Sequence, residues 1–154
     1  VLFETAAVNF LLNVIVTQAM RRPRPYSYDT GLPDDERTHG NAAMSFYSGH
    51  AATAFALATS YSRLFMLRRP NSPLVGPMWV LTMGIAAATS ALRVVAGSHF
   101  PTDVLVGSFT GIALGLLIPG IHERRDRRAR TARRSAVDLT PQVGPGVFGL
   151  QGTF

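Results

Sequence analysis

Four long apolar stretches constrain this chain of 154 residues more than any other feature, and they cover residues 1–20, 51–67, 74–92 and 104–119. A helix needs about 17–25 apolar residues to cross a bilayer, so three stretches are long enough and the fourth is slightly short. Only 16% of the residues are charged, against about 25% in an ordinary soluble domain. No stretch alternates between apolar and polar residues as strands do. We therefore predict an all-α, polytopic transmembrane helical bundle with about four helices in this chain.

Polar and small residues inside these stretches predict how the helices pack. Asn9, Asn13 and Thr17 recur every four residues and share one helix face, which we expect to point toward protein. Glycines spaced four apart from Gly107 to Gly115 form a smooth stripe that lets another helix approach closely. The first stretch lacks the basic start and the cleavage site of a signal peptide. We expect a domain that is N-terminally incomplete.

The net charge of +6 is concentrated near one end of the chain. All 15 basic residues are arginines, and residues 122–134 hold seven of them with only two acidic residues. We interpret this block as a cytoplasmic tail, which places residues 21–47 and 94–103 on the extracytoplasmic side, and we expect no nucleic-acid partner. The Gly- and Pro-rich residues that follow predict disorder. We thus divide the chain into a membrane domain, residues 1–121, and a tail, residues 122–154.

Three polar clusters lie at the extracytoplasmic ends of the apolar stretches, in residues 21–26, 46–51 and 92–107. Arginine side chains in these clusters match phosphate oxygens with two parallel hydrogen bonds. Ser48 and Gly49 precede a predicted helix, whose first N–H groups form a natural cradle for an anion. The topology brings all three clusters to one membrane face.

Two histidines and one aspartate complete this set. His50 and His99 are imidazoles that can serve as nucleophile and general acid. Asp103 follows His99 by four residues, one helical turn, and is placed to fix the tautomer of that imidazole. Together the clusters describe a metal-free site for phosphoryl transfer.

The clusters resemble the three motifs of the type 2 phosphatidic acid phosphatase (PAP2) superfamily, which shares its site with vanadium haloperoxidases. The third motif is present as Arg93, His99 and Asp103 with the spacings of the family, although Leu92 stands where the family has serine. The resemblance covers residues 1–121 and implies that they form the last four of six family helices.

The other two motifs each depart from the family at one position. The second motif is present as Ser48-Gly49-His50, with Tyr47 in the place of a proline. The first motif ends in Arg24-Pro25, but Thr17 occupies the position of its lysine. The predicted phosphate site is therefore short of one cation.

The resemblance implies a role for each matched residue. His99 attacks phosphorus to form a phosphohistidine, Asp103 orients His99, and His50 protonates the leaving oxygen and later deprotonates water. The phosphate oxygens are stabilised by a set of four residues: Arg24, Arg93, Ser48 and Gly49. No metal ion or other cofactor is implied. Arg21 and Arg22 are candidates to replace the absent lysine, and contact with lipid headgroups is their other interpretation.

These observations predict an integral membrane phosphatase that acts on a lipid phosphate or pyrophosphate at the extracytoplasmic face of a bacterial inner membrane. Its partners are then the lipid substrate and the surrounding membrane lipids. Two alternatives stay open. One is a catalytically weakened membrane protein that binds phosphate headgroups, which the departures at Thr17 and Tyr47 favour. The other is a haloperoxidase-like enzyme that holds vanadate, which the membrane-spanning pattern disfavours.

Overall fold

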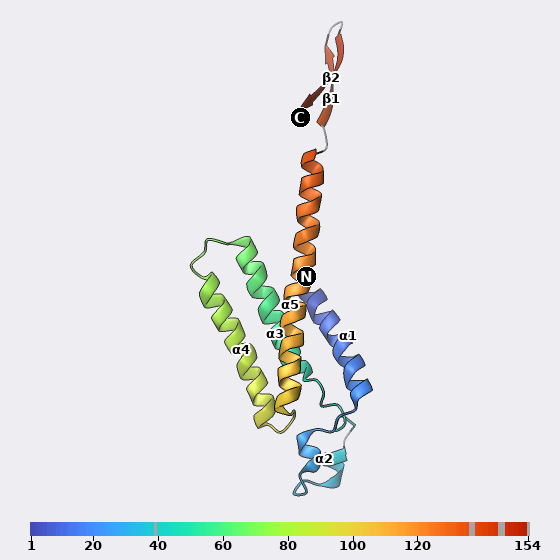
Figure 1. The fold of residues 1–154 in the computed structure, drawn as a ribbon, viewed down its shortest axis with the longest axis vertical. Helices are drawn as coiled ribbons and strands as arrows, with labels where there is room; N and C mark the ends of the chain where they lie inside the picture. Colours follow the sequence, from blue (N-terminus) through green and yellow to red (C-terminus); the bar gives the residue numbers. More distant parts are fainter. Residues whose placement is uncertain (39, 136–137, 145–146, 154) are drawn as a thin grey trace. The chain divides into compact units, whose positions relative to one another are not determined.

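The computed structural model describes residues 1–38, 40–135, 138–144 and 147–153. They divide into two compact units, residues 1–119 and 120–154. In chain order the elements are α1 (Leu2–Met20), the 3₁₀ helix η1 (Pro25–Tyr28), α2 (Asp34–Thr38), α3 (Gly49–Arg68), α4 (Val75–Val95), α5 (Pro101–Ser135), β1 (Asp138–Gly144) and β2 (Val147–Thr153) (Figure 1).

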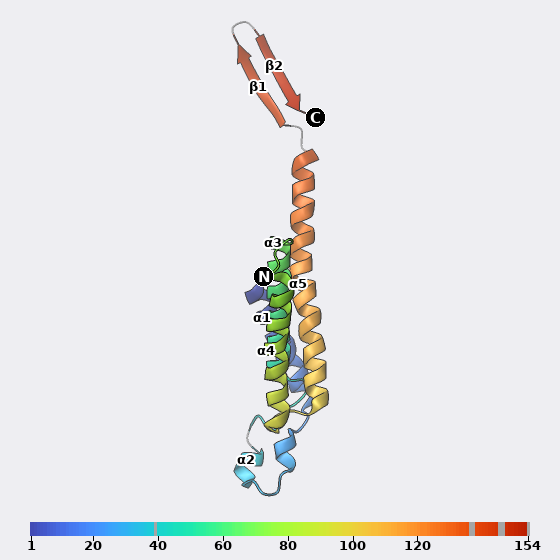
Figure 2. The ribbon, with the colours of Figure 1, turned by 90° about the vertical axis from the view of Figure 1, so that its left-hand side faces the viewer.

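Four long helices build the first unit, one for each predicted apolar stretch. Helices α1, α3 and α4 stand side by side in one layer, with α3 in the middle, and residues 101–119 of α5 cover one face of α3 (Figure 1, Figure 2). Every regular element that the structure describes between residues 1 and 119 is helical, which confirms the predicted all-α bundle.

Among the residues that the structure describes, three segments are long and apolar enough to cross a membrane: Leu2–Tyr28, Val75–Val95 and Pro101–Arg133. Helix α3 coincides with the second predicted apolar stretch, residues 51–67, but does not share this composition. Its position explains the difference, because α3 packs against α1, α4 and α5 and buries small and polar side chains, among them Thr59, Ser60 and Ser62. A central helix of this kind needs little apolar surface of its own.

The polar face of α1 points toward protein, as its sequence predicts. Asn9 is fully buried and donates a hydrogen bond from Nδ2 to Oγ1 of Thr53 on α3, at 2.9 Å. Thr17, two turns further along, is also buried. On the other faces Phe3 and Ile15 are 87% and 65% exposed, which suits contact with lipid. The period of four residues therefore marks the protein-facing side of this helix correctly.

The glycine stripe of α5 lies directly against the backbone of α3. A Cβ atom on Gly107 would come within 2.6 Å of the carbonyl oxygen of Ser48, and one on Gly111 within 2.2 Å of that of Ala52. At Gly115 the nearest atom, in a threonine side chain, would be 2.6 Å away. Separations this short exclude any side chain larger than hydrogen, so the predicted close helix approach is confirmed.

Helix α5 continues beyond residue 121, where the sequence predicts the end of the membrane domain, and ends at Ser135. Arginine and alanine are good helix formers, and Arg127 forms an ion pair of 2.7 Å with Glu123, one turn earlier. The sequence predicts disorder after this block, whereas the structure describes β1 and β2 there as an antiparallel pair. Both strands are edge strands of this two-stranded sheet, and edge strands tolerate glycine and proline because one side of each makes no ladder hydrogen bonds.

Candidate active site

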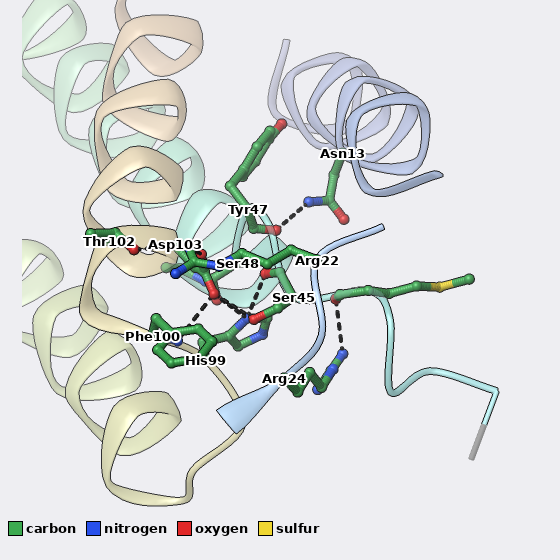
Figure 3. A network of polar contacts seen from close by, with 12 residues as sticks. Asn13, Arg22, Arg24, Ser45, Tyr47, Ser48, His99, Phe100, Thr102 and Asp103 are labelled. Carbon is green, nitrogen blue, oxygen red and sulfur yellow. Dashed lines mark hydrogen bonds and ion pairs between the residues drawn. The ribbon is translucent and has the colours of Figure 1, made fainter. Parts of the chain in front are cut away.

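The three polar clusters meet at one end of the first unit, as their predicted topology requires. The loop after α1 joins the turn between α4 and α5 through a hydrogen bond from the Tyr26 N–H to the Gly97 carbonyl, at 3.3 Å. Gly97 permits this turn because its φ of +62° lies in the left-handed region. The start of α3 joins α5 through the Ser48 N–H and the Asp103 carbonyl, 3.0 Å apart. These backbone contacts hold the predicted site residues near one another (Figure 3).

His99 lies almost fully buried in the turn before α5, with its Nδ1 atom 2.8 Å from the carbonyl oxygen of Ser45. A carbonyl oxygen can only accept, so Nδ1 carries the proton and Nε2 keeps its lone pair. Burial lowers the pKa of His99 to about 4, and the Arg24 guanidinium adds to this effect. The Ser45 carbonyl and the Asp103 carboxylate act in the opposite direction. His99 is therefore neutral at pH 7, with the protonation state of a nucleophile.

Asp103 is fully buried and accepts hydrogen bonds from three donors. Its Oδ1 accepts from Arg22 Nη1 at 2.6 Å, and its Oδ2 accepts from the Ser45 hydroxyl and from the Phe100 N–H. The bond to Phe100 caps the start of α5, as an acidic residue at the third helical position often does. Oδ2 is 3.9 Å from Nδ1 of His99, which is too far for a hydrogen bond. The sequence predicts that Asp103 binds His99 and fixes its tautomer. In the structure the Ser45 carbonyl, and not Asp103, makes the hydrogen bond with Nδ1 of His99.

Arg22 forms an ion pair with Asp103, on the side of His99 that faces away from the cavity. Its guanidinium stacks over the ring of Phe100 at 4.3 Å and also donates to the Thr102 hydroxyl at 2.9 Å. Arg21 is exposed and follows α1 directly, as its C-cap residue. Neither arginine is among the described residues that line the cavity beside the histidines. The position of the missing lysine is thus not filled by either candidate.

A cavity of about 610 Å³ opens between α1, α3 and the loop that joins them. It brings together four of the predicted site residues, Arg24, Gly49, His50 and His99, and it also touches Thr17. The remaining wall is formed by Asn9, Phe10, Asn13, Val14, Gln18, Asn41, Met44, Tyr47, Thr53 and Ala54. Two imidazoles and one guanidinium therefore face a common space that is apolar at Phe10, Val14 and Ala54.

His50 occupies the first turn of α3, outside the predicted and the candidate membrane spans. Burial lowers the pKa of His50, and the positive charges of Arg93 and Arg24 lower it further. Arg93 stands in the last turn of α4, and its carbonyl accepts from the N–H groups of Ser98 and His99. Arg93 is therefore near the histidines, although it is not among the described residues that line the cavity.

Ser48 and Gly49 begin α3 as the predicted anion cradle requires. Ser48 is fully buried, and its hydroxyl accepts from the Ala51 N–H, the standard contact of an N-cap serine. Asn13 of α1 explains why a glycine follows: its Nδ2 donates to the Tyr47 carbonyl at 2.8 Å, and a Cβ on Gly49 would lie 2.7 Å from its Oδ1. A phosphate contact from the Ser48 hydroxyl stays a prediction.

Tyr47 fills the position where the family motif has proline. Its ring is buried at the cavity wall, and its hydroxyl has no hydrogen-bond partner among the described residues.

Among all the residues that the structure describes, no group of three or more histidine or acidic side chains is arranged to hold a metal ion.

Spacing in the sequence does not single out Ser45, and for Arg22 it leaves two interpretations, a substitute cation or a contact with lipid headgroups. Ser45 belongs to no motif, because its contacts depend on how a loop folds back over α5. The pair Arg22 and Asp103 is separated by 81 positions, so spacing gives no signal for it. The one available signal is that three arginines lie within residues 21–24, more than the phosphate site needs, which indicates that one of them forms an ion pair with a distant acidic residue.

Comparisons with known proteins agree with this geometry. A sequence model of the PAP2 superfamily matches residues 1–127. A Lipid A 1-phosphatase of Porphyromonas gingivalis is 34% identical over 71% of this chain and 22% of its own length. The Lipid A 1-phosphatase of Rhizobium etli is 30% identical over 80% of this chain and 50% of its own length. This chain therefore spans half or less of these curated relatives.

A solved structure has the same fold. The transmembrane PAP2 type phosphatidylglycerolphosphate phosphatase from Bacillus subtilis matches with a TM-score of 0.66 and 26% sequence identity. The match covers 80% of this chain and 58% of that one. Together with the three candidate spans, it identifies this chain as an integral membrane protein.

Proposed function

The chain belongs to the PAP2 superfamily, as its three motifs predict, and from this premise we propose that it is a membrane phosphatase acting on a lipid phosphate or pyrophosphate. One observation carries the proposal: a buried, neutral His99 shares a cavity with His50 and Arg24. A nucleophile, a proton donor and a phosphate-binding cation are the minimum that phosphoryl transfer to an imidazole requires.

In the proposed reaction the lone pair on Nε2 of His99 forms a bond to phosphorus as the bond to the lipid oxygen breaks. His50 gives its proton to the departing oxygen. In the second step His50 removes a proton from water, the new oxygen binds phosphorus, and the phosphorus–nitrogen bond breaks to restore His99. A bound phosphate dianion offsets the charges of Arg24 and Arg93, which lower the pKa of His50, and so favours its protonated form.

Stabilisation of the transferring phosphate falls to Arg24 and Arg93, with the first N–H groups of α3 at Gly49. Preorganised donors of this kind act without reorganisation and dominate catalysis of phosphoryl transfer. Arginines and helix N–H groups neutralise the phosphate oxygens in place of a metal ion, so the proposed reaction is metal-independent. Because Thr17 stands where the family motif has lysine, this set of phosphate-binding groups has one positive charge fewer than the family motif provides.

The proposed substrate is an amphiphile whose phosphate reaches the histidines while its apolar part contacts Phe10, Val14 and Ala54. Two headgroup classes come from the relatives, whose names specify lipid A at its 1-phosphate and phosphatidylglycerolphosphate. We place the cavity on the extracytoplasmic side of a bacterial inner membrane, because the arginine-rich end of α5 favours the cytoplasmic side.

The test is phosphate release by detergent-purified protein from lipid A 1-phosphate and from short-chain phosphatidate, each with and without a chelator. We expect turnover of at least one lipid, unaffected by the chelator, and no turnover by the His99→Ala variant. Tight binding of phosphate headgroups without release would instead support the weakened headgroup-binding protein. Oxidation of halide after loading with vanadate would support the haloperoxidase-like alternative.

A further inference from the structure

Ser45 lies fully buried in the loop before α3 and contacts three members of the site at once. Its N–H donates to the Arg22 carbonyl at 3.0 Å, and its hydroxyl donates to Oδ2 of Asp103. Its carbonyl oxygen accepts from Nδ1 of His99 at 2.8 Å. Figure 3 shows Ser45 between the aspartate and the histidine, with a dashed line to each. All three polar groups of this residue are therefore committed.

The carbonyl of Ser45 is the group that defines the tautomer of His99. The Asp103 carboxylate is 3.9 Å from Nδ1, whereas the carbonyl is within normal hydrogen-bond distance. The carboxylate is moreover occupied by Arg22, by the Ser45 hydroxyl and by the Phe100 N–H. These donors satisfy much of its charge and leave it poorly placed to accept a fourth hydrogen bond, from the imidazole of His99.

We propose that Ser45 is a positioning residue for the proposed reaction and that Asp103 acts on His99 through it. The aspartate holds the Ser45 hydroxyl, the Ser45 carbonyl holds Nδ1–H, and Nε2 is thereby kept unprotonated for attack on phosphorus. The inference rests on the proposed function for its chemical meaning. Its structural content, a tautomer set by a backbone carbonyl, holds independently of the substrate.

The first test compares turnover of Ser45→Ala with that of Ser45→Thr. The alanine variant loses the bond to the Asp103 carboxylate, and because hydrogen bonds to charged groups are strong we expect kcat to fall about 10- to 100-fold with little change in KM. The threonine variant keeps a hydroxyl and restores most of kcat. Ser108→Ala is the matched control, since its hydroxyl donates only to the Val104 carbonyl within α5. Wild-type kcat in Ser45→Ala would overturn the proposal.

The second test reads the tautomer directly from ¹⁵N chemical shifts of labelled histidine in detergent, with the His99 signals assigned by their loss in His99→Ala. We expect the Nδ1–H form in the wild type and also in Asp103→Asn, because the Ser45 carbonyl accepts only a proton-bearing nitrogen. A change to the Nε2–H form in Asp103→Asn would show that the carboxylate itself fixes the tautomer and would refute the proposal.

These readouts separate the two proposals. An Nδ1–H tautomer that persists in Asp103→Asn, in a protein that hydrolyses no lipid phosphate, supports the role of Ser45 and contradicts the phosphatase. Normal lipid hydrolysis with an Nε2–H tautomer in Asp103→Asn supports the phosphatase and contradicts the role of Ser45.

Discussion

The two sides of His99 differ in how their polar groups are satisfied. Behind the ring, Arg22, Ser45 and Asp103 bind one another, and none of the three is among the described residues that line the cavity. In front of it, the Nε atom of Arg24 and the hydroxyl of Tyr47 are buried without hydrogen-bond partners among the described residues. Buried polar groups normally find partners, so unsatisfied ones beside a cavity are groups that a ligand can complete. In the proposed reaction, the rear side holds His99 in place and the front side receives the phosphate.

The strongest test of this division removes the residue that joins both sides. We expect His99→Ala to lower phosphate release at least about 1,000-fold, since loss of a nucleophile disables the whole set of cooperating residues. His122→Ala, a histidine of α5 outside the site, serves as the control and should retain activity. Near-normal turnover by His99→Ala would remove His99 from the mechanism.

A pair of arginine variants compares the two sides directly. Arg24→Ala is expected to lower kcat/KM about 100-fold, the usual cost of losing one transition-state donor, with the melting temperature unchanged. Arg22→Ala leaves the buried Asp103 carboxylate without its ion pair and should destabilise the fold by about 2–4 kcal/mol. Thermal unfolding and phosphate release, measured on both variants, check the contrast. A stable Arg22→Ala variant paired with an unstable Arg24→Ala variant would reverse the assignment of sides.

The burial of neutral His99 predicts a pH dependence of stability. The pKa of His99 is about 4 in the folded protein and has an ordinary value of 6.5, so between these values the unfolded chain binds a proton that the folded chain does not. Stability should therefore fall as the pH falls from 6.5 to 4, by up to about 1.4 kcal/mol per pH unit from this group. Unfolding curves of the wild type and His99→Gln isolate the effect. Equal slopes in the two proteins would mean that His99 is not held neutral.

The smallest expected effect comes from adding a cation to the front side. Thr17→Lys places an ammonium group at the cavity, where the family motif has lysine and where neither Arg21 nor Arg22 reaches. We expect vanadate, which mimics the five-coordinate transition state, to inhibit this variant several-fold more tightly, in line with about 1 kcal/mol for one partly exposed charge. Thr17→Met, which adds length without charge, is the control. An unchanged inhibition constant would place Thr17 outside the phosphate site.

The sequence predicts the front side better than the rear side. Motif spacing locates His50, His99 and Arg24, because residues on helix ends keep a fixed offset from one another. The α1 face and the glycine stripe are also predictable, since periodicity is a local property of a helix. The structure brings His50, His99 and Arg24 to one cavity, and the α1 face and the glycine stripe lie against protein as predicted. The chemical roles of the three site residues stay predictions.

The rear side is not predictable, because it depends on loop contacts between distant residues. Ser45 reaches His99 and Asp103 across more than 50 positions, and no spacing rule connects a loop serine to a helix start. The sequence also does not predict how far α5 continues beyond residue 121, because a block of arginines favours a solvated tail and a solvated helix equally. The contacts of Ser45 are tertiary, and the tail and helix states of the arginine block are close in free energy. Composition alone therefore predicts neither feature.

The backbone contact between α3 and α5 bears on how the site responds to its surroundings. Transmembrane helices commonly tilt or shift to match the local bilayer thickness, and such movement changes the distances between groups on different helices. Here Gly107 and Gly111 leave no room for a side chain between the two backbones, so a sliding step of α5 would bring residues that carry a Cβ atom against the backbone of α3. We expect the separation of His50 and His99 to be the same in thin and thick membranes, with the adaptation confined to α1 and α4.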